Sequence, residues 1–274
     1  MTAWLVNGSP GESVPVDDRG LAYGDGLFET IAIRAGQPRF LDAHLERLQQ
    51  GCDRLGIPYP GNERLEADIR LLGDCQHGTL KILLTRGSGP RGYAPPEVAT
   101  VTRILGLTES EADLTPVAAV RVRYCATPVA VNRALAGIKS LNRLEQVLAR
   151  AEWDDPGIQE GLMLNDRGDV VCGTMTNLFL VSGGGLLTPD LGECGVRGVM
   201  RDRVIRVAEQ NNISVAELRV SRTNIENAED MFLTNSLIGV WPVAELDGQT
   251  FTRSALTLRL MQLLADAGVT ECAV

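Results

Sequence analysis

Lys139 is the residue with the clearest chemical potential in this sequence. It follows Gly137, and apolar residues recur at helical spacing through Ala151, which predicts that Lys139 lies at the front of a helix with one apolar face. A lysine amine becomes a nucleophile when burial or a nearby cation lowers its pKa. The chain has only two lysines among its 26 basic residues, Lys81 and Lys139. A general role in solubility therefore explains neither of them.

Two loops have the composition of anion-binding segments. The glycine-rich loop Arg86–Tyr93 follows a predicted strand and carries Arg91, and a guanidinium group can bind both oxygens of a carboxylate. Gly195–Gly198 precedes a predicted helix, and free backbone N–H groups at a helix N-terminus bind anions. Ser236, at the end of a predicted strand, would add a hydroxyl group. Each loop taken alone is equally consistent with a plain connection.

Composition excludes several classes of protein. The net charge is −9 without a basic cluster, which argues against nucleic acid and anionic membrane surfaces as partners. The sequence contains no run of about 18 apolar residues, so it predicts no membrane span. The first 20 residues lack the apolar core of a signal peptide, so we expect a cytoplasmic protein.

Cysteine and histidine give little indication of a metal site. The six cysteines are scattered without C-x-x-C spacing, which predicts free thiols in a reducing compartment. The two histidines, His44 and His77, are far apart and have no neighbouring cysteine, so no zinc site and no Ser-His-Asp triad is expected. His44 falls on a periodic helix, where we expect a structural role.

Turn signals and periodicity predict a mixed α/β order. The elements expected in the first half are strands at 3–6, 27–33, 80–85 and 101–107 and helices at Leu41–Leu55, with Asp42 as N-cap, and 63–72. Those expected in the second half are strands at 117–124, 161–164, 169–172, 177–181, 186–188, 214–220 and 231–234 and helices at 199–210, near Asn224 and at 254–267. An acidic stretch at 109–115 separates the halves. The order does not alternate regularly, so a doubly wound sheet is not favoured.

Five motifs in order resemble the fold-type IV pyridoxal-phosphate enzymes, which include branched-chain and D-amino acid aminotransferases and 4-amino-4-deoxychorismate lyase. The motifs are Tyr23–Glu29, His44–Leu48, Gly137–Arg143, Asn177–Phe179 and Gly195–Arg201. Within the group, Arg86–Tyr93 and Lys139–Val147 are most similar to the aminodeoxychorismate lyases. The resemblance implies a smaller N-terminal α/β domain, residues 1–112, and a larger C-terminal barrel-like domain, residues 113–274, that binds the cofactor and carries the Schiff-base lysine.

The resemblance also implies an activity. Aminodeoxychorismate lyases convert 4-amino-4-deoxychorismate, a dicarboxylate, to 4-aminobenzoate and pyruvate in folate synthesis, and they are homodimers with active sites near the subunit interface. Two alternatives stay open. One is a D-amino acid or branched-chain aminotransferase on the same fold, and the other is a catalytically silent binding protein.

Residue roles follow from the same resemblance. The matching positions are Lys139 for the Schiff base, Arg47, Val199, Met200 and Ser236 for the cofactor phosphate, and Arg91 with Tyr93 for a substrate carboxylate. The phosphate would meet a cation and a helix N-terminus together. Because no histidine is available, Lys139 is also expected to donate the proton to the leaving group.

Cys172 departs from the family pattern. The family places a glutamate against the pyridine nitrogen a few residues before Asn-Leu-Phe, and an acid there keeps the ring nitrogen protonated. Here Cys172 occupies that position. Three readings follow: a weaker electron sink, a thiolate that partly substitutes for the acid, or a changed activity. Aromatisation of the product would let a lyase tolerate a weaker sink.

Overall fold

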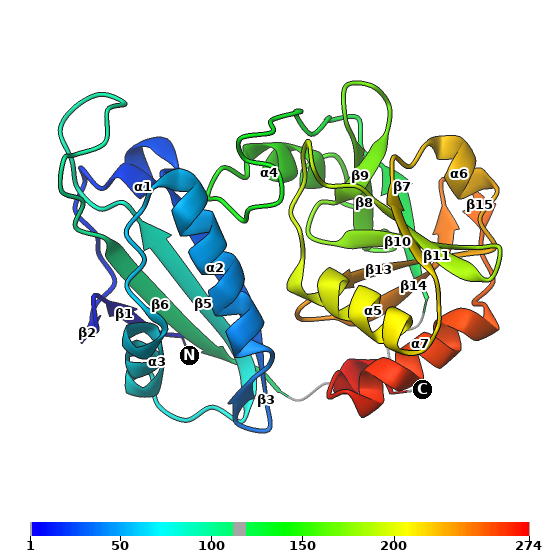
Figure 1. The fold of residues 1–274 in the computed structure, drawn as a ribbon, viewed down its shortest axis with the longest axis horizontal. Coiled ribbons are helices and arrows are strands. Elements are labelled where there is room, and N and C mark those ends of the chain that lie inside the picture. The colour runs from blue at the N-terminus through cyan, green and yellow to red at the C-terminus, as the bar shows by residue number, and fades with distance from the viewer. Residues whose placement is uncertain (1, 112–118, 274) are drawn as a thin grey trace. The chain divides into compact units, whose positions relative to one another are not determined.

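The computed structural model describes residues 2–111 and 119–273, which form two compact units (Figure 1). The first unit comprises residues 2–111 with Ile138–Asn142, and the second comprises the rest of the described chain. The domain boundary that we expected between residues 112 and 113 lies outside the described residues. We expected the C-terminal domain to carry Lys139, but the Lys139 segment belongs to the first unit. Two backbone hydrogen bonds to a strand of that unit are the reason, and they are described with the site.

The first unit is built on a six-stranded sheet in the order β2-β1-β6-β5-β3-β4, in which every described pairing is antiparallel. Its elements are β1 (Thr2–Val6), β2 (Ser9–Pro10), α1 (Arg19–Tyr23), β3 (Gly26–Arg34), β4 (Gln37–Pro38), α2 (Leu41–Leu55), α3 (Asn62–Leu71), β5 (His77–Thr85) and β6 (Thr102–Glu109). The central strands β3 and β5 correspond to the predicted strands, and α2 and α3 to the predicted helices.

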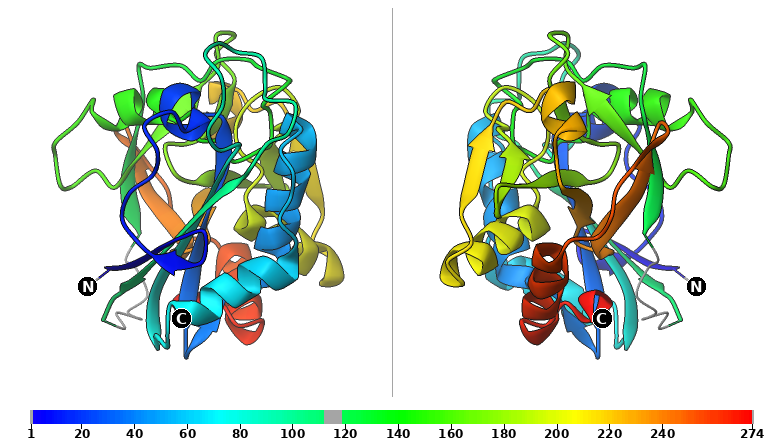
Figure 2. Two further views of the ribbon diagram at one scale, coloured as in Figure 1. Left: turned by 90° about the vertical axis from the view of Figure 1, so that its left-hand side faces the viewer. Right: turned by 90° about the vertical axis from the view of Figure 1, so that its right-hand side faces the viewer.

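Helices α2 and α3 cover the same face of this sheet (Figures 1 and 2). Leu27, Leu84 and Arg103 pair across β3, β5 and β6, so their side chains point to one face. Gly51 of α2 packs against Leu27, and Asp68 of α3 forms an ion pair with Arg103 at 2.6 Å. The helices therefore enclose the core on this side of the sheet.

Two details of the first unit differ from expectation. The N-cap of α2 is Phe40, with a φ of 55°, and Asp42 lies in the first turn, so the predicted cap is wrong. Helix α1 was not predicted. It is only five residues long, and it is defined by an Asp18 side chain that accepts from the Gly20 N–H and by Gly24 in the left-handed region.

The second unit is built on a nine-stranded sheet in the order β12-β11-β10-β13-β14-β7-β8-β9, with β15 paired to β14. Its strands are β7 (Val120–Tyr124), β8 (Glu160–Leu164), β9 (Val170–Gly173), β10 (Asn177–Ser182), β11 (Gly185–Pro189), β12 (Val215–Leu218), β13 (Asp230–Asn235), β14 (Gly239–Leu246) and β15 (Gln249–Thr250). Strands β14 and β15 were not predicted. The Val170 N–H of β9 donates to the Val220 carbonyl just beyond β12, at 2.7 Å, so the two ends of the sheet meet. The sheet is therefore curled like a barrel, as expected.

Helices and a buried apolar core complete the second unit. The helices are α4 (Leu144–Arg150), α5 (Val199–Gln210), α6 (Arg222–Glu226), α7 (Ala255–Asp266) and the short 3-10 helix η1 (Thr270–Cys272). Aliphatic side chains from opposite parts of the sheet, among them Leu162, Leu178 and Val243, fill the core. Helices α5 and α7 pack against each other beside the sheet (Figures 1 and 2).

Helix α4 corrects the prediction of an apolar helix face that begins at Lys139. The helix starts five residues after Lys139, and its apolar side chains Leu144, Val147 and Leu148 are 77%, 61% and 61% exposed. The spacing of these residues therefore indicates an apolar surface and not a buried face.

The cysteines are in the state that we expected. All six are free thiols and all are buried. Among the described residues, the structure contains no helix that has both the length and the apolar character needed to cross a membrane.

Candidate active site

Lys139 is positioned by β-type pairing with strand β3. The Phe28 N–H donates to the Lys139 carbonyl and the Leu141 N–H donates to the Gly26 carbonyl, both at 3.0 Å. The half-buried Lys139 side chain places Nζ 4.1 Å from the centroid of the Phe28 ring. The other lysine, Lys81 of β5, has its Nζ 5.7 Å from the same ring. The two lysines of the chain thus flank one aromatic ring, and each is close enough for a cation–π contact.

A buried carboxylate fixes Arg47, the predicted phosphate ligand. Glu29 follows Phe28 on β3 and is 1% exposed. It accepts from Arg47 Nε at 2.8 Å, from Arg47 Nη2 at 2.5 Å and from His44 Nδ1 at 2.6 Å. Burial alone would raise the pKa of Glu29, but the charge of Arg47 and the hydrogen bonds from both partners outweigh it and lower the pKa to about 2. Glu29 is therefore ionised at neutral pH and holds the guanidinium group in one orientation.

His44 supports the same arrangement from helix α2. Burial lowers the pKa of His44, and the Glu29 carboxylate opposes this shift only in part. Because Glu29 is ionised, Nδ1 of a neutral His44 must be the donor in their hydrogen bond. Its Nε2 is buried and has no hydrogen-bond partner among the described residues. The structural role expected for His44 is thus to orient Glu29 against Arg47.

The loop Arg86–Tyr93 contains one arginine that is structural and one that is exposed. Arg86 binds Asp25 through Nε at 2.8 Å and Nη2 at 3.0 Å, and it donates to the carbonyls of Leu55 and Gly56 at the end of α2. Arg91 is exposed, and Tyr93 is 86% exposed. The loop therefore presents these two side chains to solvent, as binding of a substrate carboxylate requires.

In the second unit, the predicted phosphate-binding residues Val199 and Met200 lie at the N-terminus of α5. Its N-cap, Gly198, provides no side-chain cap, and Val199 and Met200 form the first turn with buried side chains. A Cβ atom on Gly198 would lie only 2.1 Å from Asn177 Oδ1, so the helix start lies tightly against β10. Uncapped N–H groups and the helix dipole favour a dianion here.

Ser236 belongs to a turn attached to the same end of β10. Asn177 of β10 pairs with Thr234 of β13, and Ser236 lies two residues beyond it in a half-buried turn. The Asn235 side chain accepts from the Leu237 and Ile238 N–H groups at 2.9 and 3.0 Å, which fixes that turn. The α5 N-terminus and the Ser236 turn are thus both anchored where β10 begins.

Cys172 lies on β9, 6% exposed, in a cluster of apolar side chains with Cys125 and Cys194. Burial, with a smaller contribution from the charge of Glu160, raises the pKa of Cys172 to about 12. The side chain is therefore a neutral thiol at pH 7, and the reading in which a thiolate replaces the missing acid loses its support.

The neighbouring carboxylate, Glu160 of β8, does not take the place of that acid. Glu160 is fully buried, and its oxygens accept from the N–H groups of Gly161, Thr174 and Met175 and from the hydroxyls of Thr174 and Thr176. With these bonds the carboxylate organises the turn between β9 and β10, and its acceptor positions are already occupied.

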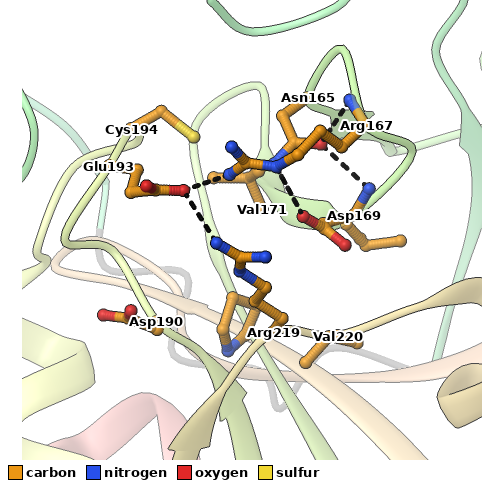
Figure 3. A pocket seen from close by; sticks show the side chains of 11 residues that line it. Asn165, Arg167, Asp169, Val171, Asp190, Glu193, Cys194, Arg219 and Val220 are labelled. Atoms are coloured by element: carbon orange, nitrogen blue, oxygen red, sulfur yellow. Dashed lines mark hydrogen bonds and ion pairs between the residues drawn. The ribbon is translucent and has the colours of Figure 1, made fainter. Parts of the chain in front are cut away.

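A small pocket elsewhere in the second unit holds a network of ion pairs. Arg167 and Arg219 both point to the carboxylate of Glu193 (Figure 3). Hydrogen bonds from Arg133 and then from Arg167 lower the pKa of Glu193 to about 2. The pocket lining also includes Val171 and Cys194, the neighbours of Cys172 in sequence and in the apolar cluster. Arg167 and Arg219 pair with Glu193, and the lining contains none of the predicted site residues.

Comparison with known proteins gives the family. Residues 26–246 match the model of the family described as amino-transferase class IV. The chain belongs to this family. Its members are pyridoxal-phosphate enzymes, in agreement with the cofactor that the sequence motifs implied.

Individual relatives refine the comparison. The chain is 37% identical over 244 residues to an aminodeoxychorismate lyase of Vibrio harveyi, covering 87% of this chain and 89% of that protein. It is similar to the crystal structure of 4-amino-4-deoxychorismate lyase from Pseudomonas aeruginosa, with a TM-score of 0.91 and 46% identity over 96% of this chain and 98% of that one. A hypothetical aminotransferase from Mycobacterium tuberculosis, solved in its PLP-bound form, has a TM-score of 0.81 and 18% identity, covers 98% and 99%, and shows the fold alone.

The chemistry of the class IV cofactor fits the residues present. In the first unit, strand β3 positions both cations. The Lys139 amine contacts the Phe28 ring, and the Arg47 guanidinium donates to the Glu29 carboxylate. In the second unit, the uncapped α5 N-terminus and the Ser236 turn carry N–H and hydroxyl groups, which are the donors that a phosphate requires. The Cys172 thiol is the one member of the predicted set whose chemistry does not match, since a neutral thiol is a poor partner for a protonated ring nitrogen.

The supporting roles of three residues were not predicted from the sequence. Glu29, which fixes Arg47, stands in a strand where alternation predicts only that it faces one side of the sheet. Arg19, the first residue of α1, and Asp25, just beyond that helix, hold the Arg86–Tyr93 loop, and a five-residue helix is too short to give a periodic signal. For Glu29, a carboxylate on the same face of the strand as the buried residues Leu27 and Ile31 was the available signal.

Proposed function

We propose that this class IV family member is a pyridoxal-phosphate-dependent lyase that converts 4-amino-4-deoxychorismate to 4-aminobenzoate and pyruvate. The observation that carries the proposal is the likeness, over nearly the whole chain, to the lyase of P. aeruginosa, combined with a lysine fixed against Phe28 by two backbone hydrogen bonds. The proposed product pair supports a role in folate synthesis, and the set of buried free thiols supports a cytoplasmic location.

The reaction needs a base and an acid at one carbon–oxygen bond, and Lys139 is proposed for both roles. Bound pyridoxal phosphate supplies an electron sink for the carbon that bears the substrate amine. The Lys139 amine removes the proton from that carbon and then gives a proton to the departing enolpyruvyl oxygen. Lys81 is the second cation near the same Phe28 ring.

The remaining site residues bind and orient. Arg47, held by Glu29, and the N–H groups of Val199 and Met200 are proposed to bind the cofactor phosphate, with the Ser236 hydroxyl as a further contact. Arg91, with Tyr93 beside it, is proposed to bind a substrate carboxylate. A dicarboxylate substrate explains why an exposed arginine stands on a loop beside an aromatic side chain.

The neutral Cys172 thiol suits a lyase better than an aminotransferase. A thiol at this position cannot keep a pyridine nitrogen protonated, so the electron sink is weaker than with a carboxylate. Elimination that forms an aromatic ring has a large driving force of its own, whereas transfer of an amino group between two acids has little. The cysteine therefore favours the elimination reaction.

The test is incubation of the protein, loaded with pyridoxal phosphate, with 4-amino-4-deoxychorismate. We expect 4-aminobenzoate and pyruvate in equal amounts without any keto-acid acceptor, and no product with Lys139→Ala. An aminotransferase, the second candidate, is favoured by the family description. It would instead convert the cofactor to its amine form with amino acids and need an acceptor. If the wild type shows neither activity and Lys139→Ala keeps its function in full, both candidates are rejected and a silent binding protein is favoured.

A homodimer is also part of the proposal. The side chains of Leu144, Val147 and Leu148 form an exposed apolar surface on α4, the helix that follows the lysine segment. Exposed apolar surfaces of this kind mark interaction sites. We expect a second copy of the chain to cover it, and sedimentation equilibrium should give a mass of two chains.

A further inference from the structure

Arg19 is a buried cation outside the predicted site. It lies at the start of α1, is only 4% exposed and is bound through Nε to Asp25 at 2.9 Å. Its other nitrogens donate to backbone carbonyls of the loop that follows β5: Nη1 to Gly92 at 2.9 Å and to Ala94 at 3.3 Å, and Nη2 to Tyr93 at 3.0 Å. The three consecutive carbonyls immediately follow Arg91, so one guanidinium group fixes the backbone beside it.

Further contacts attach the same loop to α1. The Arg19 N–H donates to the Gly87 carbonyl at 2.9 Å, and the Gly92 N–H donates to Tyr23 Oη at 3.3 Å. The rings of Tyr23 and Tyr93 meet edge to face with centroids 5.5 Å apart, and the Arg19 guanidinium lies 4.9 Å from the centre of the Tyr23 ring. Helix α1 therefore contacts the loop near both of its ends, at Gly87 and at Gly92.

The Arg19 side chain passes close to Gly89, where there is little room for a larger residue. A Cβ atom on Gly89 would lie 3.0 Å from Arg19 Cδ, so a larger residue would press on the arginine stem. The charge of Arg19 is balanced by Asp25, which also binds Arg86 at the start of the loop. The loop is thus held at Arg86 by Asp25 and at residues 92–94 by Arg19.

We propose that Arg19 is a positioning residue for substrate binding: it locks the loop so that Arg91 and Tyr93 stay presented to a substrate carboxylate. Arg19 does not touch the substrate. The inference rests on the proposed function, because the carboxylate is that of the proposed substrate. It goes beyond that function by assigning the order of the loop to a buried guanidinium group.

Limited proteolysis with trypsin tests the anchoring without any activity measurement. Trypsin cleaves after Arg91 only when the loop can enter the protease, so local release of the loop should raise the cleavage rate. We expect Arg19→Met to raise the rate of cleavage after Arg91 at least tenfold, with the site identified by mass spectrometry. Arg34→Met is the matched control, because Arg34 also donates to two backbone carbonyls, Ile33 and Gly78, but away from the loop. Equal cleavage rates in Arg19→Met and Arg34→Met would overturn the anchoring role.

Kinetics test the positioning role. We expect Arg19→Met to raise KM for 4-amino-4-deoxychorismate about tenfold with kcat changed less than threefold, and Arg19→Lys to restore only part of the loss because an ammonium group cannot reach three carbonyls in a plane. Tyr23→Phe, which removes only the hydroxyl that accepts from Gly92, keeps the test available if Arg19→Met fails to fold. It should raise both cleavage and KM by a smaller factor.

The outcomes separate the two proposals. Faster cleavage after Arg91 with an unchanged KM would refute the positioning role and leave the lyase activity standing. A wild-type protein without lyase activity would refute the proposed function and the substrate role together, and the proteolysis would still decide whether Arg19 anchors the loop.

Discussion

Replacing Glu29 by glutamine tests the arrangement that holds Arg47. The change keeps the shape of the side chain and removes the charge that Arg47 Nε and Nη2 and His44 Nδ1 bind. The pKa of Glu29 is lowered from 4.5 to about 2, a difference of about 2.5 units. At 1.36 kcal/mol per unit, the folded state gains about 3 kcal/mol from the ionised carboxylate at neutral pH. Breaking one partner of a buried ion pair costs roughly 3–5 kcal/mol, in agreement with this value.

The sign of the pH dependence is fixed by the same shift. Because the folded-state pKa is lowered, this stabilisation is fully present above about pH 4.5 and is lost as the pH falls towards about 2. Urea unfolding followed by circular dichroism should therefore show Glu29→Gln less stable than the wild type by about 3 kcal/mol at pH 7. The gap should narrow steadily as the pH falls below 4.5.

A matched control lies on the helix that carries Arg47. Glu46 of α2 is exposed and accepts a 3.3 Å hydrogen bond from Gln50, so Glu46→Gln should leave the free energy of unfolding within about 0.5 kcal/mol of the wild type. The affinity for pyridoxal phosphate should fall in Glu29→Gln and not in Glu46→Gln. A Glu29→Gln protein as stable as the control, or a stability gap that does not depend on pH between 4.5 and 2, would refute the reasoning.

Four further changes test other parts of the site. Gly198→Ala forces a Cβ atom to within 2.1 Å of Asn177 Oδ1, so it should destabilise the protein by roughly 1–3 kcal/mol and weaken phosphate binding, as measured by cofactor titration, whereas Gly11→Ala, with its nearest neighbour at 3.9 Å, should do neither. Cys172→Glu should change the absorption spectrum of the bound cofactor and increase amino-group transfer to keto acids, and an unchanged spectrum and rate would show that this position has no special role. Lys81→Met removes the second cation near the Phe28 ring, and because Lys81 is exposed, urea unfolding should show a change of less than about 0.5 kcal/mol in the free energy of unfolding; a larger loss would show that this contact stabilises the sheet. Leu148→Lys, at a side chain that is 61% exposed, should halve the mass measured by sedimentation without lowering the melting temperature of the chain by more than a few degrees, and an unchanged mass would place the dimer contact elsewhere.

Helices with strong periodicity could be predicted from the sequence, and elements defined by distant partners could not. Helix α2 was predicted because Leu45, Leu48 and Cys52 repeat at helical spacing. In the structure these three side chains are buried. Strand β14 was missed because Pro242 interrupts it, and proline weakens the sequence signal for a strand. The strand forms because β13, which precedes it directly in the chain, and β7, which is remote in sequence, pair with it from both sides.

The candidate site shows the same division. Lys139 was found from its rarity and its motif, but its surroundings were predicted wrongly as a helix face. Spacing alone cannot distinguish apolar residues that pack into a core from apolar residues that stay exposed, as Leu144 and Val147 do. The ion pair between Arg47 and Glu29 could not be predicted, because the sequence does not indicate which helix residue will pair with a carboxylate on a strand.

The path of the chain around Lys139 decides how the protein can be divided. The backbone leaves the second unit after Gly137, contributes Ile138–Asn142 to the first unit and returns at Arg143. A fragment that ends at residue 111 would contain Arg47, Glu29 and the Arg91 loop, yet its strand β3 would lack the partner that accepts from the Phe28 N–H. The two units are therefore not independent modules that recombination could exchange at a single junction. Any functional transplant of the first unit must include the segment Ile138–Asn142, and this segment carries Lys139, the proposed catalytic lysine.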